Sequence, residues 1–158
     1  MEGLVKEGLK KSETHKFTIG ENFTVFIFGH SPHHLNVTGL KSFEHLKDVV
    51  KLLERKFRIR CSDTKIDNIF MSHKDNRNIK LANVYDYIQT KYKSIFYVDY
   101  NVELFPGMFL KPKLDGWPTI ILFRTGSFQI MGGKNIQSIK KAYVHVQNII
   151  NYFIKSKL

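Results

Sequence analysis

The fold of this 158-residue chain is decided by the stretch Tyr100-Asn101-Val102-Glu103-Leu104-Phe105-Pro106-Gly107. Its last three residues are a turn or bulge signal, because proline fixes one backbone dihedral angle and glycine permits conformations that other residues avoid. Strand-forming residues lie on both sides, at 94–100 before the turn and at 108–110 after it. The stretch therefore predicts two neighbouring strands joined by a loop that ends in a sharp turn.

Further elements are predicted on both sides of this stretch. Two aromatic and β-branched runs, at 119–123 and 128–131, flank the turn signal Thr125-Gly126 and predict a hairpin. Apolar residues then recur at helical spacing and predict a final helix: Ile136, Ile139, Tyr143, Val146, Ile149, Ile150 and Phe153. Upstream, residues 78–91 predict another helix and residues 59–70 a further extended stretch.

The N-terminal part of the chain shows the same order of elements. Residues 23–28 and 35–38 predict a hairpin, and residues 43–57 predict an amphipathic helix with Ser42 as its N-cap. A hairpin, a glycine, a lysine and a helix therefore occur twice along the chain. This order indicates an internally duplicated α+β protein, although two copies of so common a unit can also arise by coincidence.

Composition points to a polyanionic partner. The formal net charge is +11 and the isoelectric point is about 9.7, which favours binding to nucleic acid or another polyanion. The alternative is a basic protein from a lysine- and asparagine-rich proteome, with no functional meaning in the charge.

Several function classes find little support in the sequence. Cys61 is the single cysteine, so we expect no internal disulfide and no cysteine-based zinc site. The histidines His30, His33 and His34 cluster in a predicted turn, and we interpret them as a polar loop rather than as metal ligands. No glycine-rich phosphate loop or nucleophile elbow is present. We expect a protein that is not an enzyme and uses no cofactor.

The location of the protein is a further expectation. The first residues lack the apolar run of a signal peptide, and no apolar stretch is long enough to span a bilayer. We therefore expect an intracellular protein with no membrane partner.

The stretch at Phe105-Pro106-Gly107 resembles the approach to the second minor-groove wedge of the TATA-box-binding protein family. Residues 122–127 resemble the strand and turn that carry the partner phenylalanine of that family. Ile66-Asp67-Asn68-Ile69-Phe70 is similar to the first strand of its second repeat. The resemblance implies an α+β saddle, in which a curved antiparallel sheet carries amphipathic helices on its convex face.

The resemblance also implies how the chain is divided. Residues 1–16 are expected to be a basic lead-in, 17–58 a partial first repeat and 59–158 a complete second repeat. The first strand and first helix of the first repeat have no counterpart in the sequence. Such divergence looks like the TATA-binding-like factors of large DNA viruses, which implies a nuclear or viral-factory location.

Period-two alternation separates two faces on each predicted strand. Thr24, Phe26 and Phe28 share one face, and Phe23, Val25 and Ile27 share the other. Both faces are apolar, although helices can cover only one, and an exposed apolar face implies a ligand or partner. The alternative is that these strands are buried on both sides.

The resemblance implies a set of DNA-binding residues. Phe105 and Phe123 would be the wedges of the complete repeat, and Phe28 the counterpart of Phe123 in the partial one. The other expected contacts are Thr38, Asn68, Ile121 and Met131 toward the groove and Lys41, Lys111, Arg124 and Lys134 toward phosphates. Core packing is the alternative for each phenylalanine, and a turn asparagine is the alternative for Asn68. Asn36 and Gln129 replace small apolar contacts of the family.

The function implied is a general transcription initiation factor that binds and bends A·T-rich promoter DNA through the minor groove. Phenylalanine wedges of this kind unstack base steps, a mechanism that belongs to the family itself. Expected partners are double-stranded DNA and a TFIIB-like factor or RNA polymerase subunit. The alternative is a degenerate saddle that serves as a protein-interaction subunit of a transcription complex without binding DNA.

Overall fold

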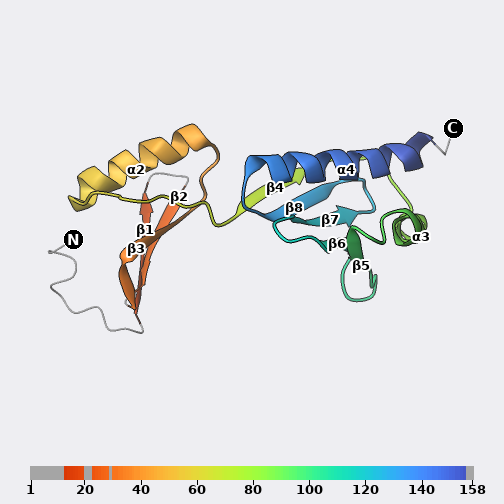
Figure 1. The fold of residues 1–158 in the computed structure, drawn as a ribbon, viewed down its shortest axis with the longest axis horizontal. Coiled ribbons are helices and arrows are strands. Elements are labelled where there is room, and N and C mark those ends of the chain that lie inside the picture. The colour runs from red at the N-terminus through yellow and green to blue at the C-terminus, as the bar shows by residue number, and fades with distance from the viewer. Residues whose placement is uncertain (1–12, 20–22, 29, 156–158) are drawn as a thin grey trace. The chain divides into compact units, whose positions relative to one another are not determined.

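The protein forms two compact units, Met1–Thr64 and Lys65–Leu158 (Figure 1). The computed structural model describes residues 13–19, 23–28 and 30–155. The sequence placed the junction slightly earlier, between residues 58 and 59. Most of the expected basic lead-in, residues 1–12, lies outside the described residues.

The described residues of the first unit form a three-stranded antiparallel sheet and one helix. The strands are β1 (Thr14–Ile19), β2 (Phe23–Phe28) and β3 (Ser31–Thr38), paired in the order β1-β2-β3. The helix is α2 (Phe43–Phe57). The predicted hairpin and helix are therefore present, and β1 adds a third strand that includes the last three residues of the expected lead-in, 14–16.

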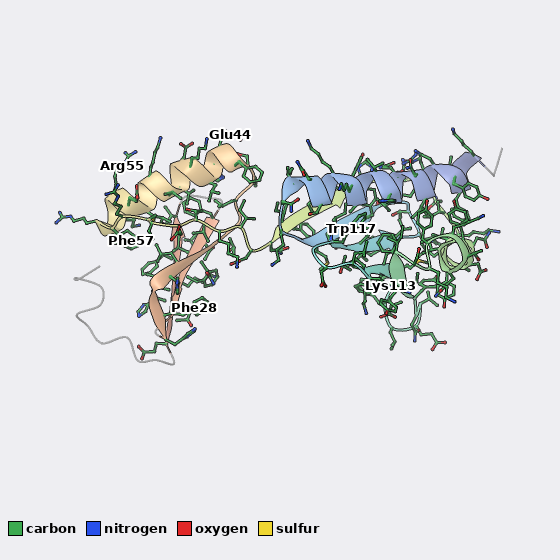
Figure 2. The ribbon with its side chains drawn as sticks, viewed as in Figure 1. Phe28, Glu44, Arg55, Phe57, Lys113 and Trp117 are labelled. Atoms are coloured by element: carbon green, nitrogen blue, oxygen red, sulfur yellow. The ribbon has the colours of Figure 1, made fainter. Side chains whose placement is uncertain are left out.

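Helix α2 begins where the sequence places its N-cap. The hydroxyl of Ser42 accepts a hydrogen bond from the backbone N–H of His45 at 3.0 Å, which satisfies one of the unpaired donors of the first turn. Val49 and Leu53, one turn apart, are buried against Phe23 and Val25 of β2. The core of this unit is small, and α2 covers one face of the sheet (Figure 2).

The second unit, over its described residues 65–155, contains a five-stranded antiparallel sheet and two helices. In chain order the elements are β4 (Ile69–His73), α3 (Leu81–Lys91), β5 (Phe96–Asp99), β6 (Gly107–Pro112), β7 (Thr119–Phe123), β8 (Phe128–Gly133) and α4 (Ile136–Lys155). The strand order is β4-β8-β7-β6-β5. Strands β6, β7 and β8 followed by α4 match β1, β2 and β3 followed by α2. The second repeat of the fold is thus more complete than the first.

One face of this sheet carries the core. Alternate residues of β6, β7 and β8 point toward the helices and are buried there: Met108, Leu110, Ile120, Leu122, Phe128 and Ile130. Figure 1 shows α4 lying along this face, and α4 supplies Ala142, Val146, Ile149 and Ile150 to the same core. Helix α3 adds Leu81, Val84 and Ile88.

Two predicted elements were too long. The extended stretch at 59–70 forms a strand only from Ile69 onward, because β8 offers pairing partners to β4 and the preceding residues have none. The predicted helix at 78–91 begins at Leu81, since Asn78 has a φ of 29°, outside the helical range.

The loop after β4 is tied to the β7–β8 turn and to α4 by polar side chains. The backbone N–H of Asp75 donates to the Ser127 hydroxyl, and that hydroxyl donates to the Asp75 carbonyl, each at 2.9 Å. The guanidinium of Arg77 donates to the Asp75 carboxylate at 2.7 Å and to Asn151 of α4 at 2.9 Å. Since the Phe123 N–H donates to the Ser127 carbonyl, this network also holds the end of β7.

The hydrogen bond from Arg77, with further bonds from backbone N–H groups, lowers the pKa of Asp75. The ionised Asp75 carboxylate therefore stabilises the folded state above the ordinary carboxyl pKa of about 3.9, and this stabilisation is lost as the pH falls through the lowered pKa of Asp75.

We predict that Asp75→Asn lowers the free energy of unfolding of the second unit at pH 7 by about 1 kcal/mol, because solvent screens a pair whose arginine is partly exposed. The difference from wild type should shrink as the pH falls below about 4. Urea unfolding followed by Trp117 fluorescence measures this, since Trp117 is the single tryptophan and lies in this unit. Asp115→Asn, at an exposed position, is the control substitution. A difference in unfolding free energy between wild type and Asp75→Asn that does not change with pH would contradict the lowered pKa of Asp75.

Candidate nucleic-acid interface

The second face of the five-stranded sheet is not covered by the helices of its own unit. Its residues alternate with those of the core. Gly107 and Ile121 are buried on it, and the others are half-buried or exposed: Phe70, Ser72, Tyr97, Asp99, Phe109, Lys111, Thr119, Phe123, Gln129 and Met131. Phe70 is 54% exposed and Tyr97 is 63% exposed. We call this surface the open face. The strands of this sheet are therefore not buried on both sides.

Three phenylalanines and one isoleucine gather on the open face around Gly107. The Phe105 ring centroid lies 5.0 Å from that of Phe109 and 6.1 Å from that of Phe123. A Cβ at Gly107 would lie 2.7 Å from Phe105 Cε1 and 2.9 Å from Ile121 Cγ2. The glycine is thus required by the close approach of the Phe105 ring. We call Phe105, Phe109, Ile121 and Phe123 the aromatic cluster.

The aromatic cluster depends on the strand register. Phe109 pairs with Ile121, and Gly107 pairs with Phe123, so the side chains of Phe109, Ile121 and Phe123 stand on one face of β6 and β7. The Phe105 ring reaches back over the sheet from the preceding loop, in which the Asn101 carbonyl accepts the Phe105 N–H at 3.0 Å. Phe105 remains 36% exposed, which leaves an apolar edge available to a ligand.

Charged groups flank the cluster on the β5 side. The Lys111 ammonium lies 2.9 Å from the Asp99 carboxylate and 5.7 Å from the centre of the Phe109 ring. Lys113 lies 4.3 Å from the centre of the Tyr97 ring, and Figure 2 shows Lys113 in this unit. The charge of Lys111 is therefore partly balanced by Asp99 until a stronger anion competes for it.

Two predicted site residues lie at the β4–β8 edge. The side-chain oxygen of Asn68 accepts the N–H of Gly132 at 2.8 Å. A backbone N–H can only donate, so the side-chain oxygen of Asn68 must face Gly132. The NH₂ group of Asn68 therefore points away from Gly132. The Lys134 ammonium donates to the Asp67 carbonyl at 2.7 Å.

The remaining predicted residues of this unit are less closely grouped. Met131 is half-buried on the open face and pairs with Thr119. Arg124 is exposed in the β7–β8 turn, where its carbonyl accepts the Ile79 N–H at 2.8 Å. The structure thus brings Phe105, Ile121 and Phe123 together but leaves Arg124 outside the aromatic cluster.

Within the described part of the first unit, the sheet face opposite α2 carries half-buried and exposed side chains; we call it the open face of this unit, and Phe28 lies on it. Phe28, which is labelled in Figure 2, stacks on Phe26 with ring centroids 6.5 Å apart, and both residues are half-buried. Asn36 is exposed opposite Phe26, and Thr38 is exposed opposite Thr24. Further exposed residues of this unit are Lys16, which pairs with Phe26, and Lys41, which follows β3.

Residues 63–153 match the family model of transcription factor TFIID, or TATA-binding protein. This match covers more than half of the chain. The chain belongs to the TATA-binding protein family. The TATA-binding protein of Methanococcus jannaschii has a similar fold, with a TM-score of 0.60 and 23% sequence identity over 82% of this chain and 72% of that one. No curated protein sequence matches the chain.

The family and fold expected from the sequence are thus confirmed, and the family is one of transcription factors. Sequence reasoning singled out Phe105 and Phe123 but missed Phe109, whose ring contacts that of Phe105. The alternation of β6 was the available signal, since it places Gly107, Phe109 and Lys111 on one face. Tyr97 and Phe70 were also missed, although both follow the same alternation on β5 and β4.

The described residues hold neither a group of three or more potential metal-ligating side chains nor a helix that is long and apolar enough to cross a membrane. Burial raises the pKa of the Cys61 thiol, and the nearby carboxylate of Glu54 acts in the same direction. Since a raised pKa keeps the thiol protonated, Cys61 lacks the thiolate character of a nucleophile.

We predict that Gly107→Ala destabilises the second unit by about 1–3 kcal/mol, because the new methyl group overlaps the Phe105 ring. The cost should be smaller in a Phe105→Ala background, since the nearest atom is then removed. Urea unfolding followed by Trp117 fluorescence measures both differences as a double-mutant cycle. An equal cost in both backgrounds would show that the ring does not lie over the glycine.

Proposed function

We propose that the protein is a TATA-binding-like transcription initiation factor that captures A·T-rich promoter DNA through the minor groove. The observation that carries the proposal is the aromatic cluster on an open apolar face. A minor-groove surface of this kind needs apolar side chains, because the groove offers few hydrogen-bonding groups and is read largely by its width and deformability.

Phe105 and Phe123 are the proposed wedges. Both rings stand at the end of the open face where β6 begins and β7 ends. Phe105 is the most exposed of the four residues of the aromatic cluster. Insertion of such rings between base pairs costs about a few kcal/mol per step and is offset by the larger surface that bent DNA buries. Phe109 packs against Phe105 and would support it during insertion.

Lysine and arginine side chains would contact phosphates around this face. Lys111 lies on β6, Arg124 in the β7–β8 turn and Lys134 directly after β8. In the first unit, Lys41 follows β3 as Lys134 follows β8. Each phosphate contact steepens the slope of the logarithm of the binding constant against the logarithm of the salt concentration by about one unit. Asn68 would donate its NH₂ group to acceptors on the groove floor, with Ile121 and Met131 as apolar contacts.

The first unit would act as a partial first repeat. Phe28 is its proposed wedge, and Thr38 its proposed groove contact. Phe28 and Phe123 end equivalent strands, since β2 and β7 are the middle strands of matching meanders. The proposal therefore places a second, smaller DNA contact on this unit.

Protein partners are proposed on other surfaces. The loop before Phe105 exposes Val102 (66%) and Leu104 (83%), and α4 exposes Lys140 and Lys141. A TFIIB-like factor or RNA polymerase subunit is the proposed occupant of these sites. The proposed place of action is the nucleus or a viral replication factory, where promoter DNA and polymerase occur.

We predict that wild-type protein prefers a short A·T-rich duplex over a G·C-rich one, and that Phe105→Ala/Phe123→Ala abolishes the preference. Removing both rings should weaken A·T binding by at least about tenfold, since each wedge buries a large apolar surface. Binding is followed by fluorescence anisotropy over a salt series.

Phe43→Ala is the matched control, because Phe43 is 44% exposed on α2 and lies outside the open faces. Its binding should equal that of wild type. Weak binding that ignores base composition, vanishes at moderate salt and does not respond to the double substitution would contradict the proposal and favour a protein-interaction subunit.

A further inference from the structure

A carboxamide stands within the apolar open face of the second unit. Gln129 lies on β8 between Ile121 of β7 and Ser72 of β4, which are its register partners on the two sides. Gln129 is half-buried and Ser72 is exposed. Within the described part of the chain, no hydrogen bond engages the Gln129 amide. Its donor and acceptor groups therefore have no partner among the described residues and lie on the open face, beside apolar Ile121 and the small hydroxyl residue Ser72.

The first unit repeats this arrangement. Asn36 on β3 pairs with Phe26 of β2, as Gln129 on β8 pairs with Ile121 of β7. Asn36 is exposed on the open face of its unit. Each meander thus carries one carboxamide at the equivalent position, beside an apolar residue of its middle strand.

In the minor groove, a carboxamide and an apolar side chain differ in the base pairs that they favour. A·T pairs present only acceptors there, whereas a G·C pair adds the N2 amino donor of guanine. An apolar side chain over guanine would leave that donor unpaired, and a buried unpaired donor is costly. The oxygen of glutamine can accept the donor, while its NH₂ group can serve the acceptors of any pair.

We propose that Gln129 allows the site to accept a G·C pair at the base step beneath β8, so that the preferred target is an A·T-rich sequence interrupted by G·C. Asn36 gives the first unit the same tolerance. This inference rests on the proposed minor-groove function and specifies the DNA sequence that it takes.

The test uses inosine, which pairs with cytosine but lacks the N2 amino group. A G·C pair and then an I·C pair are placed at each position of an A·T-rich duplex, and the dissociation constants are compared by fluorescence anisotropy. Wild type should bind the two duplexes equally, or prefer G·C, at the position that contacts Gln129. Gln129→Leu should bind I·C about tenfold more tightly than G·C there, since the amino group is left unpaired.

Two variants sharpen the result. Gln129→Glu keeps an acceptor and loses the donor, so at that position it should, like wild type, bind the G·C duplex at least as tightly as the I·C duplex, while binding all duplexes more weakly. Gln137→Leu on the exposed surface of α4 is the matched control and should behave as wild type. Unfolding followed by Trp117 fluorescence verifies that each variant is folded.

The outcomes separate this inference from the function on which it rests. If binding requires Phe105 and Phe123 but the ratio of G·C to I·C binding is the same in wild type and Gln129→Leu at every position, the role of Gln129 is overturned and the function stands. If binding does not require the two phenylalanines, both proposals fall.

Discussion

The structure of the second unit depends on one-sided burial of its sheet. Helices α3 and α4 pack on one face and bury Met108, Leu110, Ile120 and Leu122, while the opposite face holds the aromatic cluster without a covering element of its own unit. A sheet normally buries its apolar face against another layer. An uncovered apolar face is stable in solution only if it is small or has a partner, and here it is flanked by lysines that suit a polyanion.

The first unit follows the same rule with fewer elements. Its three strands and α2 match the last three strands and the long helix of the second unit, and its core is correspondingly small. Phe26 and Phe28 occupy its open face as Ile121 and Phe123 do in the second. The duplicated order of elements that the sequence indicated is thus visible as two sheets of different size, each covered on one face.

Local signals predicted much of this structure, and long-range contacts explain the rest. The N-cap Ser42 and the apolar spacing after it fixed the bounds of α2, and the strand at Thr119–Phe123 was located from its composition alone. The resemblance singled out Phe105 and Phe123 as wedges. The contact of Phe105 with Phe109 arises from strand register and from the backbone at Gly107, which composition does not reveal. The Asp75–Arg77–Ser127 network joins residues distant in sequence and has no local pattern.

The central claim is that Phe105 and Phe123 enter the DNA between base pairs. The most direct measurement places 2-aminopurine at successive steps of an A·T-rich duplex, because its fluorescence rises when the base is unstacked. Wild-type protein should raise the fluorescence at one step or at two separated steps, and Phe105→Ala/Phe123→Ala should abolish the rise at the step that these rings enter. Saturating binding by the wild type with no rise at any step would contradict the account.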